Sequence, residues 1–182
     1  GSIWHDISEE RIFPTDFISV IEIQKEEEKN ELDKETGYII LDRILYTSTH
    51  YPMNYGFIPR TLGDDGDPLD VLVMCSEPLE LDSCKMYPIG VMKMTGGGAG
   101  DEKIIAIPWA DPTYEAYTDI SELPKHIFEE IKHFFTVYKD LEGKRTAVDE
   151  FEGALGAVKI IEECIDRYKE KYGSGESDKT TE

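Results

Sequence analysis

Three aspartates, Asp65, Asp67 and Asp70, stand within six residues at the start of an apolar segment. Gly66 and Pro68 lie between them and favour a turn, because glycine accepts a positive φ and proline has no backbone N–H to donate. Ionised carboxylates held about 5 Å apart repel by roughly 3 kcal/mol per pair at an effective dielectric of about 20. The loop therefore either directs its carboxylates into solvent, as an ordinary acidic turn does, or shares a cation among them.

The position of Asp70 favours the shared cation. Asp70 opens the apolar segment, so we expect its side chain to be anchored at the start of a strand. A calcium loop of the EF-hand type does not fit, because counting from Asp65 places Ser76 where that loop needs an acid at its twelfth position.

Polar residues that stand in or beside apolar strands form two chemical sets. The acids suited to Mg²⁺ are Asp65, Asp67, Asp70 and Asp101. The donors suited to phosphate oxygens are Lys29, Arg43, Tyr55, Lys103, Tyr138 and Lys139. Each has an ordinary alternative, since Arg43 could pair with a core carboxylate and the tyrosines could be core aromatics. Together the two sets predict a site for a phosphate that arrives with its metal, where hydrolysis assisted by two metal ions is the natural chemistry.

Short strands must position these residues in the first two thirds of the chain. The strands are expected at residues 17–23, 38–46, 51–59, 71–74, 86–94 and 104–108. Their number points to a β-barrel, although sequence patterning alone leaves barrel and open sheet as alternatives.

Two helices are expected after the strands. The first starts near Leu123-Pro124, with Ser121 as its N-cap and Gly143 beyond its end. The second opens near Gly153 and packs one apolar face on the sheet. That face is predicted to comprise Leu155, Val158, Ile161, Ile165 and Tyr168. We expect one domain over residues 1–172 and a polar, disordered tail over residues 173–182.

Composition limits the partners. The formal net charge is −20, from 39 acids against 19 bases, and such a surface repels nucleic-acid phosphates and anionic membranes. The sequence contains neither an apolar run of eighteen residues nor a signal-peptide pattern, and its three cysteines form no Cys-x-x-Cys motif. We therefore expect no nucleic-acid or membrane partner and a cytoplasmic location.

Over residues 17–172 the chain resembles the family I soluble inorganic pyrophosphatases. The resemblance is carried by Val20-Ile21-Glu22-Ile23, Lys29 with Glu31, Asp42-Arg43, Tyr51-Pro52-x-Asn54-Tyr55-Gly56, Asp65-Gly66-Asp67-Pro68-x-Asp70, Gly90-Val91-x-Lys93-Met94, Asp101-x-Lys103 and His133-Phe134-Phe135-x-x-Tyr138-Lys139. It implies a mainly β fold with α, an OB-like five-stranded β-barrel flanked by two C-terminal helices. It also implies Mg²⁺-dependent hydrolysis of pyrophosphate by a homo-oligomer, with a hexamer favoured over a dimer.

The resemblance also implies roles for individual residues. Asp65, Asp70 and Asp101 correspond to metal ligands, with Asp70 shared by two ions, and Asp67 corresponds to the base that accepts a proton from water. The phosphate contacts correspond to Lys29, Arg43, Tyr55, Lys103, Tyr138 and Lys139. Glu22, Glu31 and Tyr51 are expected to support these groups.

The chain departs from the family pattern at Gly96, where the family usually carries an aspartate. In the family that aspartate helps to hold a substrate-associated metal together with the position of Asp101. Its loss predicts weaker metal binding or slower turnover, or marks an inactive or specialised copy.

Two other functional interpretations of the sequence, a binding module and a structural protein, also remain. A barrel that binds oligonucleotides would need a basic groove and exposed stacking aromatics, which a net charge of −20 disfavours. A metal-stabilised structural protein would explain the aspartates but not the lysines and Arg43.

Overall fold

The fold was obtained as a computed structural model. The backbone is described for residues 3–23, 31–32, 39–40, 53–75, 83–95, 101–141 and 147–173. Side chains are described for residues 4–21, 53–75, 85–94, 101–133 and 150–173.

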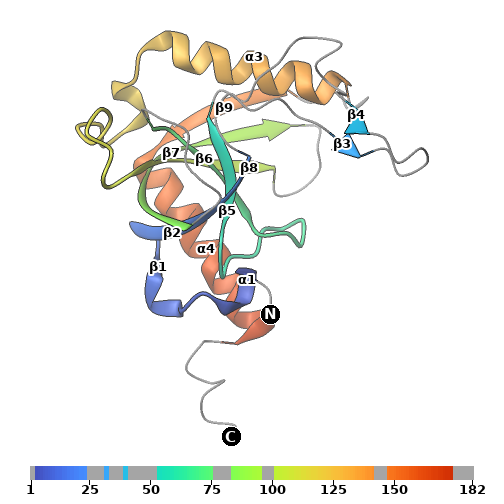
Figure 1. Cartoon of the computed structure of the whole chain (residues 1–182), viewed down its shortest axis with the longest axis vertical. Coiled ribbons are helices and arrows are strands. Elements are labelled where there is room, and N and C mark those ends of the chain that lie inside the picture. Colours follow the sequence, from blue (N-terminus) through green and yellow to red (C-terminus); the bar gives the residue numbers. More distant parts are fainter. Residues whose placement is uncertain are drawn as a thin grey trace, which may run out of the picture.

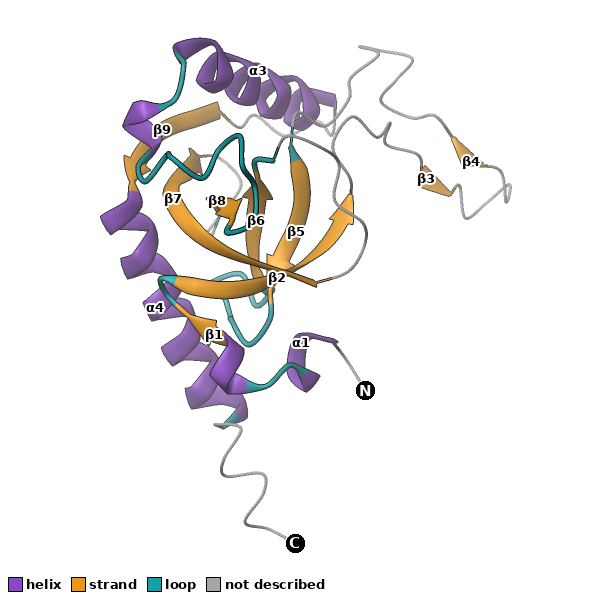
Figure 2. Cartoon of the chain, turned by 60° about the vertical axis from the view of Figure 1, so that its left-hand side comes forward, coloured by secondary structure: helices purple, strands orange, loops and turns teal. Residues whose placement is uncertain are grey.

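Five strands form a closed ring. In the order of their pairing they are β2 (Asp16–Ile23), β5 (Asn54–Ile58), β6 (Leu69–Val73), β8 (Glu102–Pro108) and β7 (Ser83–Thr95). β7 also pairs with β2 and thereby closes the ring, as Figure 2 shows. The pair β6–β8 is parallel and the other pairs of the ring are antiparallel. The barrel prediction is confirmed, and the open-sheet alternative is excluded.

Shorter elements extend the barrel. β1 (Ile12–Phe13) pairs with β2, and β9 (Ala147–Gly153) pairs with β7 on its outer side. β3 (Glu31–Leu32) and β4 (Ile39–Ile40) form a separate two-stranded sheet. The N-terminal segment adds a single helical turn, α1 (Ile3–Asp6), and a 3-10 turn, η1 (Glu9–Arg11). Sequence patterning missed β9, because its acidic residues hide the apolar alternation of a strand.

The two predicted helices are present as α3 (Lys125–Leu141) and α4 (Ala154–Tyr172), which lie on different sides of the barrel in Figure 1. The prediction that Ser121 caps α3 is wrong. Ser121 lies in the 3-10 turn η2 (Ile120–Glu122), whose N-cap is Asp119, and the Asp119 side chain accepts the Ser121 backbone N–H. Residues 142–146, including Gly143, lie outside the described part of the chain.

The start of α4 is as predicted, but its buried face is only partly so. Gly153 is its N-cap, and the Ala154 backbone N–H is bound instead by the Asp119 carboxylate, 2.7 Å away. The buried residues of the helix are Ala157, Ile160, Ile161, Cys164, Ile165 and Tyr168. Leu155 is 88% exposed, because at about 100° per residue it lies on the side of the helix opposite to the buried Cys164.

β8 is buried on both faces, which explains its unbroken apolar sequence. Ile104 and Ala106 pack in the cluster that includes α4, whereas Ile105 and Ile107 pack in the cluster that includes Ile131 of α3. A strand covered on both sides holds its backbone firmly. Any polar side chain at its end is therefore held in a defined place. In the described part of the chain, no helix is long and apolar enough to cross a membrane.

Candidate active site

The acidic loop, residues 63–68, is a tight turn that its own backbone closes. The Gly63 N–H donates to the Asp67 carbonyl over 2.8 Å, and the Gly66 N–H donates to the Gly63 carbonyl over 3.1 Å. Asp65 Oδ1 accepts the Asp67 N–H over 3.0 Å, and Gly66 has a φ of 87°, which only glycine adopts without strain. The predicted turn is confirmed, and Asp65 and Asp67 are exposed on it.

Directly after this loop, the parallel strands β6 and β8 bring an acid and a base together. Asp70 is the register partner of Lys103 although the two are 33 residues apart in the chain. Lys103 Nζ lies 2.9 Å from Asp70 Oδ2, and the Lys103 side chain is only 6% exposed. The ammonium therefore lies in a medium of low dielectric, while the Asp70 carboxylate, 36% exposed, keeps contact with solvent.

Tyr55 of β5 completes this buried contact. Lys103 Nζ donates to the Tyr55 hydroxyl over 3.1 Å and lies 5.3 Å from the centre of its ring. The strand lies so close to β2 here that a Cβ on the neighbouring Gly56 would collide with the Val20 carbonyl. Burial, more than any neighbouring charge, raises the pKa of Tyr55, so its hydroxyl is a neutral donor near pH 7.

Lys103 remains charged despite its burial. Burial lowers the pKa of its ammonium, but the neighbouring Tyr55 and Asp70 act in the opposite direction and raise it overall. The Asp101 carboxylate lies on the same ammonium, with Oδ1 at 3.8 Å. One lysine thus lies between two aspartates that come from different segments.

Asp101 has a buried carboxylate oxygen that could accept a further ligand. Its Oδ2 is buried and has no hydrogen-bond partner among the described residues. A buried carboxylate oxygen without a partner is costly unless a further donor or a cation reaches it.

Asp70 and Asp101 offer ligands that suit a hard cation, although the described residues do not form a complete coordination shell. Across the described ranges, no three His, Cys, Asp or Glu side chains are arranged as a metal-binding group. The available ligand atoms are nevertheless hard carboxylate oxygens: Asp101 Oδ2 has no hydrogen-bond partner among the described residues, and one oxygen each of Asp70 and Asp101 lies beside the Lys103 ammonium.

The described residues include only part of the predicted site. It brings Tyr55, Asp70, Asp101 and Lys103 together and places Asp65 and Asp67 on the adjoining loop. Lys29, Arg43, Tyr51 and Gly96 lie outside the described residues. For Glu22, Glu31, Tyr138 and Lys139 the structure gives the strand or helix, but no side chain.

Sequence analysis missed two residues outside the acidic loop, namely Thr61, which binds the segments on either side of it, and Arg167, which binds Asp64 within it. The Thr61 hydroxyl donates to the Ile58 carbonyl over 2.6 Å and accepts the Leu69 N–H over 3.0 Å. Arg167 of α4 lies 2.8 Å from Asp64 Oδ1. A hydroxyl residue just before a turn is a common signal, but nothing local indicates a partner about a hundred residues away.

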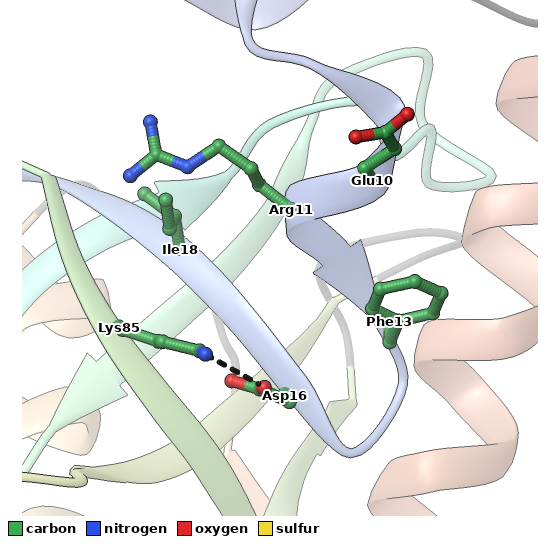
Figure 3. Close-up of a pocket in the computed structure, with 6 residues that line it drawn as sticks. All are labelled: Glu10, Arg11, Phe13, Asp16, Ile18 and Lys85. Atoms are coloured by element: carbon green, nitrogen blue, oxygen red, sulfur yellow. Dashed lines mark ion pairs between the residues drawn. The ribbon is translucent and has the colours of Figure 1, made fainter.

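A pocket of about 330 Å³ lies beside the end of β8 that is farther from Lys103, and it is lined by Glu10, Arg11, Phe13, Asp16, Ile18 and Lys85 (Figure 3). The Lys85 carbonyl accepts the Trp109 N–H, which places this end of β7 beside the end of β8. Lys103 lies six residues earlier, a separation of roughly 20 Å along an extended strand. The pocket is therefore separate from the acidic loop.

The sequence profile of the inorganic pyrophosphatase family matches residues 19–169. The chain is 48% identical over 172 residues to "Soluble inorganic pyrophosphatase 2" of Chlamydomonas reinhardtii, covering 93% of this chain and 89% of that one. It is 49% identical over 170 residues to "Soluble inorganic pyrophosphatase PPA1" of Solanum tuberosum, covering 92% and 80%.

Solved structures of bacterial proteins resemble both the sequence and the fold. The inorganic pyrophosphatase of Helicobacter pylori is 43% identical with a TM-score of 0.74, over 86% of this chain and 95% of that one. The inorganic pyrophosphatase of Thermus thermophilus is 34% identical with a TM-score of 0.79, over 93% and 99%.

Proposed function

The chain belongs to the family of soluble inorganic pyrophosphatases, and from that premise we propose that it hydrolyses pyrophosphate to two orthophosphates with Mg²⁺ as cofactor. The observation that carries the site is the contact of the Lys103 ammonium with both Asp70 and Asp101, together with a buried Asp101 Oδ2 to which no described residue forms a hydrogen bond. Acids for a metal and a donor for phosphate meet there at one end of the barrel.

Asp65, Asp70 and Asp101 would hold Mg²⁺, because their oxygens are the ligands that this ion prefers. When bound, Mg²⁺ supplies positive charge to the phosphates and lowers the pKa of water at the site. One oxygen of Asp65 accepts the Asp67 N–H, a bond that helps to fix the shape of the loop and does not depend on a metal ion. Preorganised ligands lose less freedom on binding.

Asp67 is proposed to accept the proton of the attacking water. Its carboxylate is exposed at the tip of the acidic loop, while its backbone N–H and carbonyl are both used to close the turn. A carboxylate is a weak base near neutrality, so it can act only on a water whose pKa is already lowered.

Lys103 and Tyr55 are proposed to donate to phosphate oxygens as negative charge develops on the leaving group. Lys29, Arg43, Tyr138 and Lys139 are proposed to join them, with Glu22, Glu31 and Tyr51 in support. A buried, charged Lys103 beside a neutral tyrosine hydroxyl suits this role, since both groups can donate and neither can accept a proton near pH 7.

The test measures phosphate release from pyrophosphate across a Mg²⁺ titration. ATP and a phosphomonoester are assayed separately as control substrates. Selective release from pyrophosphate that requires the metal is expected. Comparable release from all three substrates, or none from pyrophosphate, would contradict the proposal and favour a binding module with the same barrel.

Asp67→Asn tests the base. We expect turnover to fall by roughly 100-fold and the acid limb of the pH profile to change, because general-base catalysis contributes about 10²- to 10⁴-fold. If the rate and the pH profile barely change, Asp67 is not the base.

Gly96 leads to a second version of the same function, a catalytically weakened or inactive pyrophosphatase that binds one metal ion less tightly and therefore needs more Mg²⁺. The variant Gly96→Asp should reduce the Mg²⁺ concentration for half-maximal activity by roughly tenfold, since an added carboxylate strengthens binding of a hard cation. The measurement is the Mg²⁺ titration of both proteins side by side. An unchanged Mg²⁺ dependence would assign Gly96 no part in metal binding.

We also propose a cytoplasmic homo-oligomer, with a hexamer favoured over a dimer. In the described part of the chain Cys164 is a buried thiol, which suits a reducing compartment. Light scattering after gel filtration measures the number of subunits directly.

A further inference from the structure

The N-terminal strap, residues 4–7, is bound to the segment that leads into the acidic loop. The Arg60 N–H donates to the Trp4 carbonyl over 3.0 Å, and the Trp4 indole N–H donates to the Thr61 carbonyl over 2.8 Å. These two bonds join segments 57 residues apart.

Arg60 strengthens this connection with its side chain. Its guanidinium donates to the His5 carbonyl over 3.0 Å and to the Ile7 carbonyl over 3.3 Å, and the residue is only 8% exposed. Arg60 has a φ of 54°, a conformation that side chains rarely adopt unless their surroundings impose it. The backbone turn at Arg60 is therefore maintained by the strap.

The strap itself rests on α4. His5 Nδ1 and the Tyr168 hydroxyl lie 2.7 Å apart, and the Trp4 ring packs on the edge of Tyr172 with centroids 5.6 Å apart. The Arg60 guanidinium lies over the Tyr168 ring at 5.2 Å. Figure 1 shows α1 beside the C-terminal part of α4.

The same helix holds the next residues of the loop from the other side. The Leu62 N–H donates to the Cys164 carbonyl over 3.0 Å, and the Arg167 guanidinium binds both the Leu62 carbonyl and Asp64 Oδ1, each at 2.8 Å. Residues 60–64 are thus held between the strap and α4.

Thr61 transmits this position to the proposed metal ligands. Its hydroxyl binds the backbone at Ile58 and at Leu69, the residue before Asp70. Two residues further on, Gly63 closes the loop that carries Asp65. A shift at Thr61 would therefore move both carboxylates.

We propose that Trp4 and Arg60 are positioning residues for metal binding, and that the strap holds Asp65 and Asp70 in place before the metal arrives. This rests on the proposed function of those two aspartates as ligands. Without the strap contacts, the two carboxylates would still be available as ligands. They would have to become ordered when Mg²⁺ binds, and this entropy cost would weaken the affinity for Mg²⁺.

The test compares Trp4→Phe with Trp109→Phe. Each variant keeps an aromatic ring and removes one indole N–H hydrogen bond. Trp4 binds the Thr61 carbonyl, whereas Trp109 binds Asp16 Oδ1 over 3.0 Å at the far end of β8. Arg60→Gly is the stronger variant, because glycine accepts the positive φ while the guanidinium contacts are lost.

Two measurements do not depend on activity. Amide hydrogen exchange of residues 61–70 in the metal-free protein reports the order of the loop, and calorimetric Mg²⁺ titration without substrate reports affinity. We expect faster exchange and a Mg²⁺ affinity lower by roughly threefold in Trp4→Phe and by roughly tenfold in Arg60→Gly, about the loss of one and of two hydrogen bonds. The rate at saturating Mg²⁺ should stay near that of the unaltered protein, and Trp109→Phe should match that protein throughout.

Exchange and affinity that change no more in Trp4→Phe and Arg60→Gly than in Trp109→Phe would overturn the inference. Asp65→Asn separates this failure from that of the proposed function. If Asp65→Asn weakens Mg²⁺ binding and the strap variants do not, only the strap inference fails. If Asp65→Asn binds Mg²⁺ as the unaltered protein does, the ligand assignment fails and the strap inference fails with it.

Discussion

Two lysine–aspartate pairs lie near opposite ends of β8, and they differ mainly in burial. Lys103 lies 2.9 Å from Asp70 with 6% of its side chain exposed, whereas Lys85 lies 3.2 Å from Asp16 with 66% exposed (Figure 3). Each pair also binds an aromatic polar group, the Tyr55 hydroxyl at one end and the Trp109 indole N–H at the other.

The difference teaches what makes an ion pair useful for chemistry. Water screens the Lys85 pair, and such exposed pairs contribute about 0–1 kcal/mol. In the other pair the Lys103 ammonium is shielded from solvent, although Asp70 is about as exposed as Asp16, and a second carboxylate, Asp101, contacts the same ammonium. Similar residue types thus form a candidate active site at one end of the strand and a solvated contact at the other.

The largest expected effect separates the two lysines by turnover. Lys103→Met should reduce the rate of pyrophosphate hydrolysis by at least about 100-fold, because a preorganised donor to developing charge is typically worth that much. Lys85→Met is the matched control and should change the rate by less than about twofold. Steady-state phosphate release at saturating Mg²⁺ measures both, and similar losses in the two variants would break the comparison.

A smaller effect is expected on the free energy of unfolding. Asp70→Asn leaves the Lys103 ammonium buried without its closest carboxylate, which should cost about 1–3 kcal/mol, below the figure for a fully buried pair because Asp70 is partly exposed. Asp16→Asn should cost less than about 1 kcal/mol. Urea unfolding of the metal-free variants at pH 7 gives both values, and a larger loss in Asp16→Asn would reverse the interpretation.

The smallest effect is the response to salt. At 1 M salt the screening length falls to about 3 Å, so the coupling energy of Lys85 and Asp16 should approach zero. The coupling of Lys103 and Asp70 should persist, because solvent ions do not reach a buried lysine. Double-mutant cycles at low and high salt measure the two couplings. Equal salt sensitivity would show that burial does not distinguish the pairs.

Much of the fold could be predicted because its signals are local. The acidic loop depends on Gly66 and Pro68, and the start of α4 depends on Gly153, so a few neighbouring residues determine each. The sequence was a less reliable guide to which residues of α4 are buried. Leu155 precedes Val158 and Ile161 by steps of three residues, and these steps drift around the helix, so that Leu155 lies on the side opposite to the buried Cys164.

The candidate site divides in the same way. The Asp-Gly-Asp-Pro pattern and the apolar strand after Asp70 indicated an acidic site, and the motifs over residues 17–172 indicated the family. No local pattern indicated that Trp4 and Arg60 support that loop, because their contacts join segments that are far apart in the chain.

By itself, the sequence determined the chemistry available to this protein, its turns and most of its strands, since steric preferences act between near neighbours. Only the tertiary structure decided which lysine faces which aspartate. That choice follows from the parallel register of β6 and β8, which sets Asp70 opposite Lys103. The burial of both faces of β8 then shields the Lys103 ammonium from water, so that its attraction to Asp70 is stronger than that of an exposed lysine would be.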